Sequence, residues 1–471
     1  MWQQFQPKKV FLFMLSIMLG LSVWLLPTPE GVTDQAWQLL AIFVFTIAGI
    51  ITKPLPMGAM AFIGLMFLVV TRTLSFEDAF SGFNNNVVWL IVFAFFIARG
   101  FIKTGLGSRL AFLIMKFLGK STLGMGYGLV ATDLLLAPAI PSLTARAGGV
   151  IFPVLTSLAK AFGSEPHAHP RKMGAYLMNT AFQGSVVTSA MFLTAMAGNP
   201  LIADLAAEVG VNLSWGTWAL AASVPGLLCL LILPYVMYKI YPPEVKQTPD
   251  ARAFACKELK AMGPIAFQEW VMLFTFVLLI SLWIMGPVIK MAAAAAALLG
   301  LCVLLLTKVI SWDDIIKEKG AWNILIWFAT LITMAGYLNK LSLTKWFSQA
   351  VVGHLVGVDW LMGFIVLGLI YYYSHYFFAS NVAHIGSMFP PFLILSVGLG
   401  VPPALAVLTL AFFSSLFGGL THYGCGPAPI FFGAGYVPVT TWWRNGFAMS
   451  VIYILIFGVV GGFWWKTLGL F

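Results

Sequence analysis

Long apolar runs separated by short polar connections are the feature of this sequence that most limits its possible folds. Runs at 10–26, 35–52 and 55–71 follow one another with connections too short for another element, which indicates antiparallel helices joined by tight turns. With 60% hydrophobic residues, 9% charged residues and a mean hydropathy of +0.94, the chain cannot form a soluble domain. The runs do not alternate polar with apolar positions, as barrel strands would. We therefore predict an all-α polytopic membrane protein.

The second half of the chain repeats the first. The segment Thr71–Asp78 matches Thr307–Asp314, and Ser142–Leu155 matches Ser380–Leu393 at nearly the same spacing. Each half holds five full-length apolar runs and one interrupted pair, and this odd number of crossings places the two halves in opposite orientations. The sequence thus predicts two inverted-topology repeats, with about 11 transmembrane helices plus two re-entrant hairpins.

The repeats define the domain organisation that we expect. Residues 1–34 form an N-terminal helix, and 35–241 form the first repeat with its re-entrant hairpin. Residues 242–268 are the longest hydrophilic connection and act as a cytoplasmic linker, and 269–471 form the second repeat with the other hairpin.

The formal net charge of +10 fits membrane orientation better than nucleic-acid binding, because the Lys and Arg recur between apolar runs and do not form one patch. With re-entrant hairpins, about 20 of them fall on one side of the membrane and about five on the other. This asymmetry predicts a cytoplasmic N-terminus and a periplasmic C-terminus. Lys8 and Lys9 are also typical of a signal peptide, but no small-residue cleavage site follows before Pro27, which favours a retained first helix.

A polar, helix-breaking stretch at 138–149 interrupts the apolar sequence of the first hairpin. Its two prolines remove backbone donors and its glycines permit close backbone approach, so the freed backbone groups can face a cavity or a ligand. Arg146 lies within the stretch, and a cation at bilayer depth costs about 2.5 to 3.5 kcal/mol on insertion scales. We therefore expect Arg146 to meet an anion, as the main fixed cation of a binding site.

The equivalent stretch of the second repeat begins at Ser380 and places His384 opposite Arg146. Alone, a serine such as Ser142 bonds more often to the preceding helical turn than to a ligand, and a Pro-Gly interruption is often only a kink. Two such interruptions in inverted halves would meet near the membrane midplane, where half-helix N-termini direct amides and positive dipole ends at an anion. The pairing therefore favours a binding site.

Further helix breaks follow both hairpins, at 196–200 and 421–427. Thr421 is the better ligand candidate among them, whereas His422 could as easily be an interfacial histidine. No catalytic box is present. We expect no disulfide, metal or cofactor, because the four cysteines have neither metal nor redox spacing; they are Cys229, Cys256, Cys302 and Cys425.

At these residues the chain resembles the divalent anion/sodium symporter family, and within it the exchanger branch of 2-oxoglutarate/malate and citrate or tartrate/succinate translocators. The family signature is a Ser-Asn-Thr triplet in each half, and the exchanger branch continues the first as Thr-Ala-Arg-x-Gly-Gly, here Thr144–Gly149. The segment Gly419–Pro429 is similar to the same branch. Because Leu143 and Val382 depart from the triplets, the polar ligands that carry over are Ser142, Thr144, Ser380 and Asn381.

The resemblance implies an antiporter that exchanges 2-oxoglutarate, malate, succinate or fumarate-type dicarboxylates without sodium. It further implies a homodimer with an elevator-type motion, and Arg146 and His384 standing where a symporter holds sodium ions. A sodium-coupled di- or tricarboxylate symporter is the alternative. The substrate-binding residues that we predict are Ser142, Thr144, Arg146, Ser380, Asn381, His384 and Thr421.

Two other classes of function are disfavoured. An intramembrane enzyme using His384 or His422 as a base would need a nucleophile in a recognised spacing, and neither histidine has one. A channel fits poorly, because two re-entrant hairpins with a buried arginine suit a closed binding site better than a continuous pore. No segment rich in Ser and Arg precedes the first apolar run, so we expect a bacterial inner membrane and no plastid transit peptide.

Overall fold

The computed structural model describes all residues except 1–6, 167, 344 and 347–358. Within these described residues every regular element is a helix, and the one isolated β-bridge joins Ser121 to Gln247. Several helices begin at a Ser or Thr whose side chain accepts a hydrogen bond from the first turn, as Thr33 does for α2 and Ser214 for α12. These caps satisfy backbone donors that a helix start would otherwise leave unpaired.

The first half of the chain forms α1 (Pro7–Trp24), α2 (Asp34–Thr52), α3 (Met57–Val70), α4 (Phe76–Ala79), α5 (Asn86–Thr104), α6 (Leu106–Leu118), α7 (Thr122–Leu136), α8 (Leu143–Arg146), α9 (Phe152–Ala161), α10 (Gly174–Met191), α11 (Gly198–Ala207) and α12 (Trp215–Ile240). The second forms α13 (Ala251–Ala261), α14 (Phe267–Ile289), α15 (Ala293–Leu306), α16 (Trp312–Lys317), α17 (Lys319–Lys340), α19 (Trp360–Tyr373), α20 (Asn381–Gly398), α21 (Pro403–Leu416), α22 (Ala428–Gly433), α23 (Val439–Leu455) and α24 (Gly462–Thr467).

Eight helices among the described residues are long and apolar enough to cross a membrane: α1, α2, α5, α12, α14, α17, α20 and the continuous α23–α24 segment. Shorter apolar helices include α3, α7 and α15. The prediction of an all-α polytopic membrane protein is therefore confirmed.

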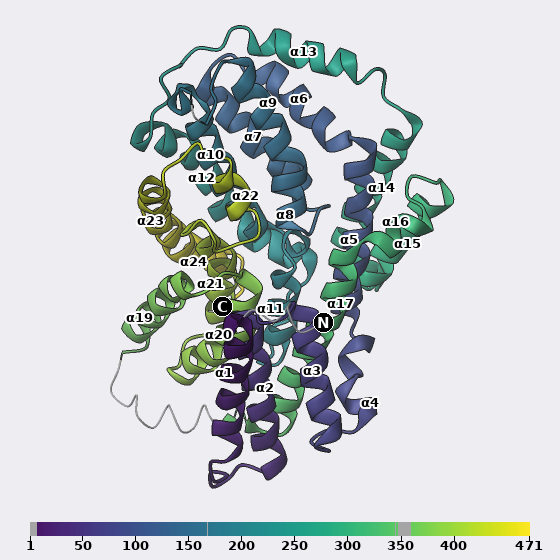
Figure 1. The fold of residues 1–471 in the computed structure, drawn as a ribbon, viewed down its shortest axis with the longest axis vertical. Coiled ribbons are helices and arrows are strands. Elements are labelled where there is room, and N and C mark those ends of the chain that lie inside the picture. The colour runs from purple at the N-terminus through teal and green to yellow at the C-terminus, as the bar shows by residue number, and fades with distance from the viewer. Residues whose placement is uncertain (1–6, 167, 344, 347–358) are drawn as a thin grey trace.

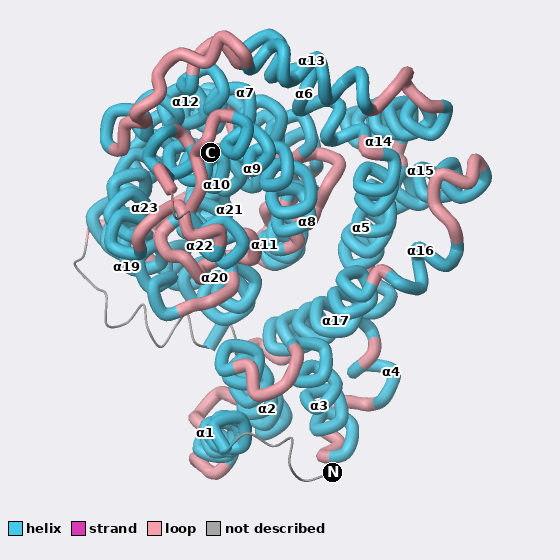
Figure 2. Tube along the Cα trace, turned by 45° about the horizontal axis from the view of Figure 1, so that its top comes forward, coloured by secondary structure: helices cyan, strands magenta, loops and turns pink. Residues whose placement is uncertain are grey.

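The helices form two bodies (Figures 1 and 2). We call α1–α5 with α14–α17 the frame, and α7–α12 with α19–α24 the core body; Figure 2 shows them side by side. Each body takes helices from both repeats. The helices α6 and α13 pack on each other and link the bodies along one face, at the top of Figure 1, which we call the linker face.

The inverted repeat is visible in the frame. Helix α5 of the first repeat packs on α15 of the second, and α17 of the second packs on α3 of the first. Since α5 is equivalent to α17 and α3 to α15, the same pair of helices packs together twice across the two repeats. The helix ends agree as well: Lys53 after α2 and Lys290 after α14 both have φ 54°, and Arg72 and Lys308 both have φ 58°. Equivalent backbone turns at equivalent positions confirm the two-repeat fold.

The joint between the frame and the linking helices contains a buried ion pair. Arg109 on α6 donates from Nε to Glu269 at 2.6 Å and from Nη2 at 3.1 Å. Its Nη1 also donates to the Gly263 carbonyl at 3.0 Å. Removing one partner from a buried pair leaves an uncompensated charge, so this contact fixes α6 against the start of α14.

Each repeat contributes one hairpin to the core body. The first consists of α7, a turn at 137–142 and the helical stretch 143–161, and the second consists of α19, a turn at 374–380 and α20. A broken helix follows each hairpin, at the α10–α11 and α21–α22 junctions. These breaks bring backbone polar groups to membrane depth, where only a protein interior or a cavity can accommodate them.

Candidate functional site

The tips of both hairpins meet in one cavity of about 290 Å³, which we call the tip cavity. Residues 141–144 and 379–382 line it from the hairpins, and 196–197 and 425–426 line it from the helix breaks. The frame supplies the rest of the wall: Lys53, Met57, Phe95, Ile324 and Trp327. The structure thus brings four predicted site residues into a single space, namely Ser142, Thr144, Ser380 and Asn381.

The two predicted serines are equivalent helix caps. The Ser142 hydroxyl accepts a hydrogen bond from the Ala145 amide at 3.1 Å, and the Ser380 hydroxyl accepts one from the Ala383 amide at 3.4 Å. Each serine therefore fixes the start of a helix at the cavity wall. The first-turn amides of these helices carry the positive end of the helix dipole, so both tips present donors suited to a carboxylate.

Thr144 and Asn381 are held by close neighbours. A Cβ added to Gly426 would overlap the Thr144 hydroxyl, so the absence of a side chain at Gly426 lets the first hairpin tip approach the second helix break. Asn381 donates from its amide to the Ser414 carbonyl at 3.1 Å, and its side-chain oxygen has no hydrogen-bond partner among the described residues.

Arg146 lies behind the first tip and is fully buried. Its Nε donates to Asp133 of α7 at 2.9 Å, and its Nη1 donates to the carbonyls of Ile140 and Ala195, both at 2.9 Å. It is not part of the tip-cavity wall. The anion that Arg146 meets in this structure is Asp133, and a contact between Arg146 and substrate stays a prediction.

Asp133 is the partner of Arg146 that the sequence reasoning missed. Its second carboxylate oxygen accepts from Thr188, whose hydroxyl also lies 3.3 Å from Arg146 Nη2. A sequence signal was present, because Asp133 is an acidic residue inside an apolar run and a carboxylate at that depth requires a partner.

The equivalent positions of the second hairpin hold a tyrosine and a histidine in place of this ion pair. At the repeat spacing that pairs Ser142 with Ser380, Asp133 corresponds to Tyr371 and Arg146 to His384. His384 is buried; its Nδ1 lies 2.9 Å from His375 Nδ1, its Nε2 lies 3.2 Å from Ser374 Oγ, and its ring packs on Tyr371. His384 therefore also lies behind its hairpin tip and outside the cavity wall.

Thr421 follows the same pattern. It is buried, it does not line the tip cavity, and its hydroxyl has no hydrogen-bond partner among the described residues. The seven predicted residues thus divide into four that face the tip cavity and three that lie behind it.

Lys53 is the cation that the structure places at the tip cavity. It ends α2, is exposed, and donates from Nζ to the Ala379 carbonyl of the second hairpin at 3.3 Å. Sequence reasoning assigned Lys53 only to a tight turn between helices. Its equivalent in the second repeat, Lys290, is the signal that could have singled it out.

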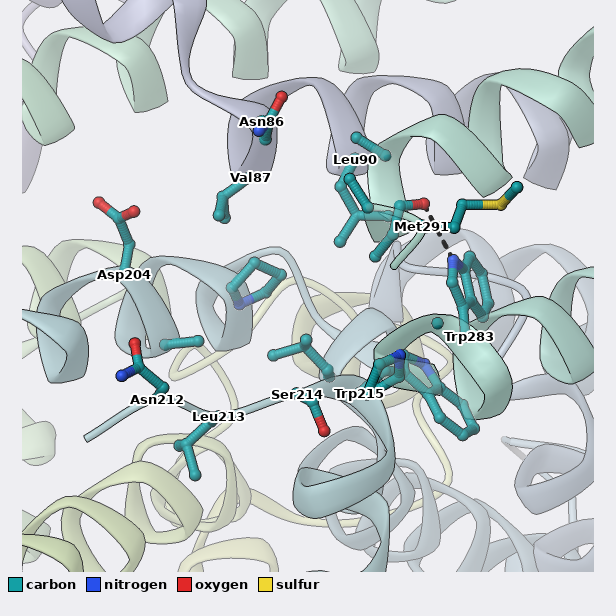
Figure 3. Close-up of a pocket in the computed structure, with 18 of the residues that line it drawn as sticks. Asn86, Val87, Leu90, Asp204, Asn212, Leu213, Ser214, Trp215, Trp283 and Met291 are labelled. Carbon is teal, nitrogen blue, oxygen red and sulfur yellow. Dashed lines mark hydrogen bonds between the residues drawn. The ribbon is translucent and has the colours of Figure 1, made fainter. Parts of the chain in front are cut away.

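A second, larger cavity of about 560 Å³ lies between the frame and the core body, and we call it the far cavity. Figure 3 shows Val87 and Leu90 of α5 on one side and Asp204 and Leu213 on the other. The ends of α14 and α15 complete its wall around Lys290.

Two re-entrant hairpins whose tips meet in one cavity inside a bundle of apolar helices define the class of secondary transporters built from inverted repeats. Residues 7–471 match the family model described as the sodium:sulfate symporter transmembrane region. The chain belongs to this family, the divalent anion/sodium symporters.

Three similar proteins support this assignment. YflS of Bacillus subtilis (strain 168), provisionally named a malate transporter, is 53% identical over 98% of this chain and 97% of its own. Dicarboxylate transporter 1 of Spinacia oleracea, a chloroplastic protein, is 52% identical over 99% of this chain and 83% of its own. The crystal structure of the Alcanivorax borkumensis YdaH transporter has the same fold, with a TM-score of 0.60, 13% identity, and coverage of 98% of this chain and 97% of that one.

Proposed function

We propose that the protein exchanges one dicarboxylate for another across a bacterial inner membrane. The observation that carries the proposal is the convergence of two Ser-capped helix starts on one cavity. A dicarboxylate has an anionic group for each tip, and capped helix starts offer amide and hydroxyl donors to both. Relatives about half identical to this chain are named as malate and dicarboxylate transporters.

Ser142 with Thr144 orients one carboxylate, and Ser380 with Asn381 orients the other. Arg146 and His384 hold the tips from behind through their hydrogen bonds. Thr421 is buried outside the tip-cavity wall. The protein acts as a carrier and not as an enzyme.

Sodium independence follows from what occupies the space behind the first tip. Backbone carbonyl oxygens at membrane depth are the ligands that a hard cation prefers. Here the carbonyls of Ile140 and Ala195 accept hydrogen bonds from the Arg146 guanidinium. A covalently attached cation therefore uses carbonyls that could otherwise bind a metal ion.

Obligate exchange follows from the cost of an empty site. Without substrate, two positive helix ends and several polar groups would cross a dry interface unpaired. Each 1.36 kcal/mol added to that barrier slows the step about tenfold. The Asp133 carboxylate already neutralises Arg146, so the helix ends, and not a free arginine, supply this penalty.

An elevator-type motion of the core body past the frame is supported by the two cavities. The tip cavity and the far cavity use equivalent parts of the frame, as repeats related by inversion would provide. The tips would occupy the tip cavity in one state and the region of the far cavity in the other. The linker face is then cytoplasmic, as are the N-terminus and residues 242–268, whereas the C-terminus is periplasmic. The repeats are 35–241 and 269–471.

We expect a homodimer in which the frame is the fixed part, as in the family that the sequence resembles. The description of the family model as a sodium:sulfate symporter favours one alternative, sodium-coupled symport.

Uptake of labelled 2-oxoglutarate into proteoliposomes distinguishes dicarboxylate exchange from sodium-coupled symport. We expect fast uptake only with malate trapped inside, and equal rates in choline and sodium buffer. Fast uptake into empty vesicles that depends on external sodium would contradict exchange and support symport.

A further inference from the structure

Lys53 and Lys290 occupy equivalent positions in the two repeats. Each is exposed and caps the C-terminus of its helix in the left-handed conformation, with φ 54° and ψ 47° at Lys53 and φ 54° and ψ 36° at Lys290. The Lys53 backbone amide donates to the Gly49 carbonyl, and the Lys290 backbone amide donates to the Gly286 carbonyl. These two glycines are themselves repeat equivalents. The two lysines therefore leave the frame in the same way but, because the repeat is inverted, toward opposite faces.

The surroundings of the two lysines are equivalent as well. At the spacing that pairs Lys53 with Lys290, Val87 and Leu90 correspond to Ile324 and Trp327, and Met57 corresponds to Ala294. Lys53, Met57, Ile324 and Trp327 line the tip cavity; Lys290, Ala294, Val87 and Leu90 line the far cavity. The frame thus presents nearly the same surface twice, with one lysine at each (Figure 3 shows the α5 part of the second surface).

Neither lysine forms a salt bridge within the described residues. The tip-cavity wall contains no acidic residue among the described residues, so the Lys53 ammonium has no carboxylate partner there. Its hydrogen bond to the Ala379 carbonyl at 3.3 Å holds it beside Ser380, the cap of the second hairpin. An ammonium on a flexible stem has three donors, so it can keep this contact and accept a carboxylate too.

We propose that Lys53 and Lys290 are matched binding residues for the dicarboxylate. Lys53 contacts it when the tips face the linker side, and Lys290 contacts it when they face the opposite side. Each lysine acts on one side only because it belongs to the fixed frame. This inference rests on the proposed dicarboxylate exchange and adds a binding residue on the frame for each state.

The repeat also predicts the second contact of Lys290. Ala379 precedes Ser380 in the second hairpin as Pro141 precedes Ser142 in the first. In the opposite state the Lys290 ammonium therefore donates to the Pro141 carbonyl of the first hairpin. Asp204, which shares the far cavity in this structure, belongs to the core body and moves away with the tips.

The test measures substrate binding from each side separately. Right-side-out and inside-out membrane vesicles, preloaded with saturating malate, take up labelled malate over a range of external concentrations. The variants are Lys53→Asn and Lys290→Asn, because Asn is neutral and tolerates the left-handed conformation. Lys53→Arg keeps the charge. Lys308→Asn is the matched control, since Lys308 is exposed, has φ 58° and lines neither cavity.

We expect Lys53→Asn to raise the half-saturating malate concentration about fivefold on the linker side only, as for a partly exposed ion pair. Lys290→Asn should do so on the opposite side only. Lys53→Arg, which keeps the charge, should raise the linker-side value less than Lys53→Asn does, and Lys308→Asn should stay near wild type. The unaffected side shows that each variant is folded. Wild-type exchange with no change in either Asn variant, or with equal changes on both sides, overturns this inference alone. Absence of malate exchange in the wild type overturns the proposed function as well.

Discussion

At the scale of single residues, the site depends on which charges are already neutralised. Arg146 is the most buried cation that the sequence reasoning identified, yet its guanidinium is fully used by Asp133, three backbone carbonyls and Thr188. These contacts join the first hairpin to α10, and we propose that Arg146 acts as a positioning residue. Arg146 stabilises the protein only as part of the ion pair, because either charge alone would carry a large desolvation penalty at this depth.

Replacing Arg146 with Gln should destabilise the protein by about 3 to 5 kcal/mol, because it leaves Asp133 as an unpaired buried charge. The double variant Asp133→Asn, Arg146→Gln removes both charges and should melt at a higher temperature than Arg146→Gln alone. Thermal unfolding of the purified proteins measures the difference. A double variant that loses the sum of the two single losses would show that the charges are not coupled.

The four residues at the tip cavity should affect affinity more than stability. Thr144→Ala and Asn381→Ala should each weaken dicarboxylate binding about 3-fold to tenfold, the value of a hydrogen bond of roughly 0.5 to 1.5 kcal/mol. Bonds to a charged carboxylate oxygen give larger losses. Isothermal titration with malate measures this, and unchanged affinity in both variants would remove these residues from the site.

At the scale of elements, two hairpins and two helix breaks must approach closely to form one cavity. The tightest approach is Gly426 against Thr144, where a Cβ would overlap the hydroxyl. The same short segment offers a control at Gly433, where an added Cβ would have no neighbour within 4 Å.

Gly426→Ala should therefore slow exchange about 10- to 100-fold, because a displacement on the order of 1 Å at a binding group has that effect on a rate. Gly433→Ala should exchange at the wild-type rate. Initial rates of malate exchange in proteoliposomes with equal protein content compare the two. Equal rates for both variants would show that the first hairpin has room to shift without loss.

Hairpins were predictable as elements, because Pro-Gly interruptions at equivalent places in both repeats indicate chain reversals at membrane depth. The partners of each tip were not. Asp133 and Arg146 are close in the sequence, on the two arms of one hairpin. Thr188 and Ala195, however, come from the next helix and its break, and nothing in the local pattern indicates which carbonyl faces which donor.

At the scale of the whole molecule, the exchange mechanism that we propose would require the core body to move relative to the frame. Lys53 on α2 and Ala379 before α20 are in contact across the two bodies. Gly148 and Ile430 are in contact within the core body, since a Cβ on Gly148 would lie 2.7 Å from the Ile430 side chain.

In a protein whose four cysteines are replaced, a short cross-linker between Lys53→Cys and Ala379→Cys should stop exchange almost completely. A cross-link between Gly148→Cys and Ile430→Cys should leave the exchange rate of that variant unchanged. Rates before and after cross-linking, and after cleavage of a reducible linker, provide the measurement. Undiminished exchange with the bodies joined would rule out the elevator-type motion.

The sequence by itself determined the membrane class, the all-helical architecture, the inverted repeat and the two hairpins, because hydropathy and repeat spacing are properties of the chain that need no partner. The resemblance of its hairpin motifs to the family signature also indicated the four residues that face the tip cavity. Only the tertiary structure decided that Arg146 is paired with Asp133 and that Lys53 reaches the cavity. Burial and charge pairing arise from contacts between distant segments. They depend on how helices of the two repeats pack, which local sequence patterns do not encode.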